Sequence, residues 1–203
     1  MGTRPQIAER ESVHVYIALL SVIPRTRCSH DRKVWERPEI AEKPLSVSTD
    51  KLAYPAKRCV TLLADLERID SADISRDGSG LACEVYPDPA LRIWSREMAK
   101  GLTGRMSYKG KGNTKIRAGL VSIIQAATGI SGEEHFFGQC EESDDCLDAL
   151  VCALIARAVT IGATVAPTDG GLNADEIHQV EREGWIHLPR GPSSLGLLGA
   201  HKP

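Results

Sequence analysis

The stretch that most constrains the fold spans residues 143–159 and reads SDDCLDALVCALIARAV. Its apolar residues recur three and four positions apart, the period of an amphipathic helix: Leu147, Leu150, Val151, Leu154, Ile155 and Ala158. Ser143 precedes this pattern, and its hydroxyl can accept an orphan backbone N–H of the first turn. We therefore expect a helix that Ser143 caps and that buries one face in the core.

Three aspartates stand at the start of this helix. At about 100° per residue, Asp144 and Asp148 fall at the border of the apolar face, whereas Asp145 lies further towards solvent. A carboxylate at such a border is partly desolvated, which suits a metal ligand. The alternative is that acids in a first turn only offset the helix dipole, which explains Asp144 and Asp145 without any function. It explains Asp148 less well, because that residue lies in the second turn.

The composition narrows the class of protein. The 203 residues suffice for one domain with a hydrophobic core. A net charge of −2 does not support broad electrostatic binding, so nucleic acid would be a partner only through a local basic patch. The six cysteines show no C-x-x-C pair and no zinc spacing, and we expect a reducing, cytoplasmic setting. The longest apolar run, residues 13–23, is too short to span a membrane.

Strands and helices are expected to alternate from residue 44 onwards, which predicts an α/β fold with a sheet and flanking helices. Residues 1–24 form an uncertain N-terminal segment, in which 14–23 could be a buried strand or a short helix. The tail 191–203 is expected to be flexible. The remaining expected elements are an extended stretch at 44–50, a helix from Pro55, a strand at 81–87, and helices at 88–94, up to Gly129, at 143–159 and at 173–183, followed by a short strand at 185–189.

Two further residues attract attention outside the helix. Glu84 is a charge in the middle of the short, otherwise apolar strand LACEVYP. It is either a solvent-facing residue of an edge strand, since antiparallel sheets often leave one face wet, or a ligand at a sheet surface. Lys109 lies in the Gly-rich basic loop SYKGKGN and could meet phosphate, although most such lysines are simply solvated.

Several stretches together resemble the domain of unknown function 429 family, whose members are predicted nucleases with a ribonuclease-H-like fold. The matches occur in the family's order and cover roughly residues 25–190: PLSVSTD (44–50), PAKR (55–58), EVYPDPALRIW (84–94), SYKG (107–110), SDDCLDALVCALIARA (143–158) and EGWIHLP (183–189). The resemblance implies a mixed sheet flanked by helices, with acidic residues collected at one end.

The resemblance also implies a site. Glu84 would be the central-strand acid, and Asp145 and Asp148 would be the helix pair. These three carboxylates would hold Mg²⁺ or Mn²⁺ ions that activate water for attack on a phosphodiester. Lys109 would neutralise phosphate charge as a point charge. The implied function is therefore a metal-dependent nuclease with Glu84, Asp145, Asp148 and Lys109 as catalytic residues.

The chain departs from the family at its start. Family members usually begin with a strand that carries an early Asp, whereas HVYIALLSVIP contains no carboxylate. We therefore expect either an N-terminally incomplete chain or a degenerate homologue, with severely weakened activity because Mg²⁺ requires near-octahedral coordination. The alternative function is a non-catalytic interaction protein that retains the fold. A nucleotide-binding phosphotransferase is disfavoured, because the required phosphate-cradling Gly-rich loop is missing.

Overall fold

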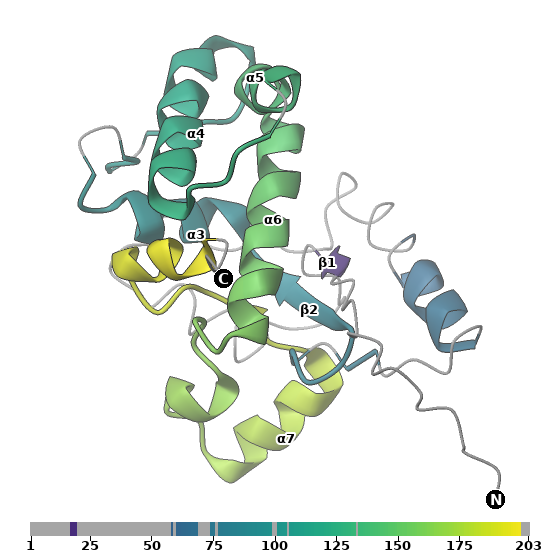
Figure 1. Cartoon of the computed structure of the whole chain (residues 1–203). Coiled ribbons are helices and arrows are strands. Elements are labelled where there is room, and N and C mark those ends of the chain that lie inside the picture. The colour runs from purple at the N-terminus through teal and green to yellow at the C-terminus, as the bar shows by residue number, and fades with distance from the viewer. Residues whose placement is uncertain are drawn as a thin grey trace, which may run out of the picture.

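The structure is a computed structural model, and it describes residues 17–19, 58, 60–68, 74–75, 77–98, 101–104, 106–132 and 134–199. This part of the chain is a mixed α/β arrangement, mostly helical, with a small sheet (Figure 1). The stretch expected to be extended at 44–50 lies outside the described residues. None of the described helices is both long and apolar enough to cross a membrane.

The sheet contains three parallel strands in the order β1-β2-β3, with bounds Ile17–Leu19, Ala82–Val85 and Ile186–His187. The first of these lies within the apolar run at 14–23, where the expectation left strand and helix open. Antiparallel pairing in the described part is limited to isolated bridges, such as that between Asp77 and Cys83. The strand pairing is therefore parallel where the resemblance implied a mixed sheet.

Helices account for most of the described chain. Residues 58 and 60–68 are helical, as expected for a helix that follows Pro55. The other helices are α3 Pro87–Ser95, α4 Thr114–Thr128, α5 Glu134–Glu142, α6 Asp144–Thr160 and α7 Ala174–Glu183, with 3₁₀ turns η1 Lys111–Asn113, η2 Pro167–Gly170 and η3 Pro192–Leu198. The predictions at the positions of α3, α4, α6 and α7 are confirmed, whereas α5 was not expected.

Helix α6 lies in the centre of the molecule and contributes most to the core (Figure 1). The Ser143 hydroxyl accepts the backbone N–H of Cys146 at 3.3 Å, so the predicted cap is confirmed. The predicted apolar face is buried at Leu147, Val151, Leu154, Ile155 and Ala158. Because these side chains pack against β2, α3, α4 and η3, the sequence of α6 places Asp148 at the edge of the main core.

Strand β2 has different partners on its two faces. Cys83 and Val85 belong to the main core together with α6, whereas Ala82 packs with Leu63. Since successive side chains leave opposite faces of a strand, Glu84 lies on the Ala82 face. Glu84 is only 1% exposed, and its strand is the central one. The interpretation of Glu84 as a solvent-facing residue on an edge strand is therefore wrong, because this small parallel sheet is covered on both faces.

The segment expected to be a flexible tail packs into the core over residues 191–199. Leu195 and Leu198, three positions apart on η3, are each 1% exposed. The indole Nε1 of Trp94 donates to the Ser194 hydroxyl at 3.1 Å, and η3 lies beside α3 (Figure 1). Its position at the chain terminus suggested mobility. Two leucines at the 3₁₀ spacing, however, supply an apolar face that packs into the core.

His187 links β3 to two neighbouring segments. Its Nε2 lies 2.9 Å from the Asp77 carbonyl oxygen and its Nδ1 lies 3.1 Å from the Thr164 hydroxyl. A carbonyl oxygen only accepts, so we assign the ring proton to Nε2 and let Nδ1 accept from Thr164. Burial lowers the pKa of His187 and outweighs the opposing effect of Asp77.

The lowered pKa of His187 predicts a loss of stability in acid. The unfolded chain binds a proton near pH 6.5, whereas the folded chain binds it only at lower pH, so the free energy of unfolding falls as the pH drops below about 6.5. Urea unfolding at about pH 7.5 and about pH 5.5 measures this effect. Between these two pH values, the free energy of unfolding should fall further for the wild type than for His187→Gln. The control is His178→Gln, at an exposed residue of α7. Its free energy of unfolding should fall between the two pH values by as much as that of the wild type. An equal fall in the free energy of unfolding in all three proteins would contradict the lowered pKa of His187.

Candidate functional site

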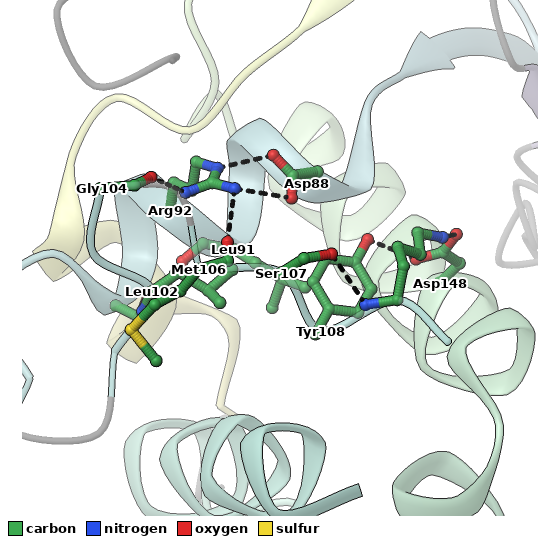
Figure 2. Close-up of polar contacts among 11 residues, drawn as sticks. Asp88, Leu91, Arg92, Leu102, Gly104, Met106, Ser107, Tyr108 and Asp148 are labelled. Carbon is green, nitrogen blue, oxygen red and sulfur yellow. Dashed lines mark hydrogen bonds and ion pairs between the residues drawn. The ribbon is translucent and has the colours of Figure 1, made fainter. Parts of the chain in front are cut away.

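Two of the residues singled out from the sequence meet at the edge of the core. The Lys109 ammonium forms an ion pair with Oδ2 of Asp148. The Tyr108 hydroxyl donates to the other oxygen, Oδ1, at 2.7 Å (Figure 2). The Lys109 nitrogen also lies 5.0 Å from the centroid of the Tyr108 ring. Both Asp148 oxygens are therefore engaged by neighbouring residues of one loop.

Asp144, one turn before Asp148, belongs to the same cluster. Its Oδ2 accepts the backbone N–H of Gly110 at 3.2 Å, so both carboxylates hold the loop that contains Lys109. Asp145 is exposed, which confirms its expected position on the solvent side, and its role as a ligand stays a prediction. The sequence offered a signal for Asp144, since it shares the border of the apolar face with Asp148.

The electrostatics of the cluster follow from burial and from these contacts. Burial raises the pKa of the Asp148 carboxyl, against the hydrogen bonds from Lys109 and Tyr108. Burial also acts upwards on Asp144, but backbone N–H groups and the charges of Lys109 and Arg117 hold its pKa below the ordinary value. Burial, together with the charge of Asp148 and the hydrogen bond to it, raises the pKa of Tyr108. The phenol therefore keeps its proton and remains a donor to Asp148.

Arg92 of α3 holds the chain that leads into this loop. Its guanidinium pairs with Asp88, with Nε 2.7 Å from Oδ2, and donates to the carbonyl oxygens of Gly104 and Met106 at 2.8 Å (Figure 2). Arg92 is 7% exposed. The segment before Tyr108 is therefore tied to α3, although the sequence carried no clear signal for this contact.

Arg117 of α4 holds the loop from the other side. It donates to the carbonyl oxygens of Tyr108 and Gly110, both at 2.8 Å, which flank Lys109. A signal for Arg117 exists in the sequence, because it shares the buried face of α4 with Leu120 and Ile124 at helical spacing. A charge on an apolar face requires a set of buried partners.

The described residues do not form the implied metal centre. Glu84 lies on β2, on the face opposite the one that packs against α6, whereas Asp148 lies on α6. Across the described ranges, no group of three or more His, Cys, Asp and Glu side chains is arranged to hold a metal ion. The structure thus brings Asp148 together with Lys109 and does not gather Glu84, Asp145 and Asp148 into one ligand set. Their metal-binding roles stay predictions.

Cys152 on α6 lies near Cys83 on β2 and near Asp148. Burial raises the pKa of Cys152 to about 12, with the charge of Asp148 and the nearby Cys83 as further causes. Burial and the neighbouring Glu84 raise the pKa of Cys83 to about 12 as well. Both thiols are free and protonated near neutral pH, so they behave as small apolar side chains.

Comparison with known proteins places the chain in a family. The model of a family described as "Protein of unknown function (DUF429)" matches residues 27–170, which is more than half of the 203-residue chain. The chain belongs to the DUF429 family. No curated protein and no solved structure matches it. The DUF429 match confirms the family suggested by the motifs, and its description assigns no activity. The matched residues include both Lys109 and Asp148.

Proposed function

We propose that the chain is a nuclease, a phosphodiester hydrolase of the ribonuclease-H-like type, with its centre at Asp148. The observation that carries the proposal is the half-buried Asp148 carboxylate, which lies between a phenol donor and an ammonium at the surface. Two family motifs, SYKG and SDDCLDALVCALIARA, meet at this point although they are distant in the sequence. A functional site would explain why a carboxylate with a raised pKa is kept there.

The residues of the cluster have distinct roles in this proposal. Lys109 is 43% exposed, so its ammonium can exchange Asp148 for a phosphate oxygen of the substrate. Tyr108 keeps its proton and holds Asp148 in one orientation. Enzymes of this type use Mg²⁺ or Mn²⁺, which remains part of the proposal. The described residues do not fit a two-ion centre by themselves, so no step is assigned to an ion.

The proposal predicts that Asp148→Asn lowers cleavage by about 10²-fold or more, because a positioned carboxylate in hydrolysis contributes on this order. The measurement is cleavage of fluorescent single-stranded and duplex DNA and RNA in the presence of Mg²⁺ or Mn²⁺. Asp175→Asn, at the exposed start of α7, is the control. Cleavage that is unaffected by Asp148→Asn would reject the site.

A second candidate is a non-catalytic interaction protein that retains the fold. It is favoured by the contacts of the carboxylates, since both Asp148 oxygens and one Asp144 oxygen already accept from the loop. Calorimetry with MgCl₂ and MnCl₂ separates the two candidates. Binding heat that disappears in Asp148→Asn would reject the non-catalytic role, whereas absence of both heat and cleavage would favour it.

A further inference from the structure

We propose that Arg117 is the positioning residue of this site. Its guanidinium fixes the loop around Lys109 against the corner between α5 and α6, so that the Tyr108 hydroxyl and the Lys109 ammonium reach Asp148. For the chemistry at Asp148, this inference rests on the proposed function. The positional role of Arg117 is argued from its hydrogen bonds alone.

Arg117 is 1% exposed, and each of the five N–H donors of its guanidinium has an acceptor. The acceptors are the carbonyl oxygen of Glu141 for Nε (2.7 Å), the carbonyl oxygens of Tyr108 and Gly110 for Nη1 (both 2.8 Å), and the Thr114 hydroxyl (3.3 Å) and the carbonyl oxygen of Glu142 (2.8 Å) for Nη2. These acceptors are four carbonyls and one hydroxyl. A lysine, with three donors and no planar fork, cannot reproduce this set.

The charge of Arg117 is compensated by the end of a helix. Glu141 and Glu142 are the last two residues of α5, where the backbone carbonyls lack helical partners and carry the negative end of the helix dipole. Arg117 therefore caps α5 and holds the corner from which α6 begins. Its charge also reaches Asp144, where it helps to lower the carboxyl pKa.

The same guanidinium determines the path of the loop. The two carbonyls that it binds belong to Tyr108 and Gly110, so the peptide groups on both sides of Lys109 are held. Gly110 has φ 87° and ψ 163°, a conformation that is essentially restricted to glycine. In this conformation its carbonyl points to Arg117 while its N–H reaches Asp144. With the loop held in this way, the Lys109 side chain meets Asp148.

Competitive labelling of lysines with trace acetic anhydride, resolved by mass spectrometry, tests the proposal without an activity assay. Lys109 should react several-fold more slowly than the exposed Lys111 of the same loop, because Asp148 holds its ammonium. In Arg117→Lys the ratio of the two rates should approach one, as it should in the reference variant Asp148→Asn. Ile124→Val is the control for general destabilisation, because it removes a core methyl and should leave the ratio unchanged.

A second variant covers the case in which Arg117→Lys does not fold, as judged by circular dichroism. Gly110→Ala moves the loop through its backbone, since a Cβ there meets no atom within 4 Å but φ is left-handed. It should expose Lys109, whereas Gly112→Ala, which also meets no atom within 4 Å, should not. Lys109 that stays protected in folded Arg117→Lys, or in Gly110→Ala, overturns the positioning role. Absence of cleavage with the expected labelling would count only against the proposed function.

Discussion

Replacing Gly101 with alanine is expected to destabilise the fold by roughly 3 kcal/mol or more, the upper range for overpacking. A Cβ at Gly101 would lie 1.9 Å from the backbone oxygen of Ser95, and both residues are buried. Ser95 cannot yield, because its hydroxyl donates to the Leu91 carbonyl at 2.6 Å and accepts the N–H of Leu102 at 3.0 Å. The end of α3 and the following loop would therefore have to separate.

Urea unfolding measures this effect, and Gly112→Ala serves as the control. Gly112 lies in the 3₁₀ turn η1, where a Cβ meets no atom within 4 Å, so its substitution should change the free energy of unfolding by less than about 0.5 kcal/mol. A Gly101→Ala protein as stable as the control would show that the chain between α3 and Tyr108 does not pack as described.

Trp94→Ala should cost about 3–5 kcal/mol, the range for removing a large buried aromatic side chain. Trp94 is 1% exposed, packs in the main core, and donates its indole N–H to Ser194. Its loss removes the contact between α3 and η3, so limited proteolysis should also cut residues 192–198 faster than in the wild type. The free energy of unfolding of Trp94→Phe should lie between those of the wild type and Trp94→Ala.

Ser194→Ala separates packing from hydrogen bonding in this contact. It leaves the ring in place and orphans one buried N–H, which should cost about 1–3 kcal/mol by urea unfolding. If Trp94→Ala costs no more than Ser194→Ala, the ring does not fill the core, and the packed position of η3 would be wrong.

The local elements could be predicted from residues close together in the chain. The periodicity of α6, the cap at Ser143 and the end of α4 at Gly129 are confirmed. Such features depend on interactions within a few residues. Helix α5 was not predicted because its sequence EHFFGQCEE has few apolar residues at helical spacing. This helix is held in part by Arg117, which belongs to another helix.

The candidate site was only partly predictable. The half-buried position of Asp148 followed from its place on the helix, and Lys109 followed from a family motif. That the two meet did not follow, because 39 positions separate them and the loop that contains Lys109 is held by Arg117 and Arg92. The burial of Glu84 could not be predicted either. The alternation of side chains along β2 shows that the strand has two faces, but it does not show what covers them.

The amino-acid sequence by itself determined where α3, α6 and α7 lie, where α4 ends, which face of α6 is apolar, and that Asp148 lies at the border of that face. The tertiary structure alone decided that residues 191–199 join the core and that Glu84 lies on a central strand. It also decided that two buried arginines hold one loop. The physical reason is that helix periods and caps are local interactions, whereas burial and hydrogen-bond partners depend on segments that only folding brings together.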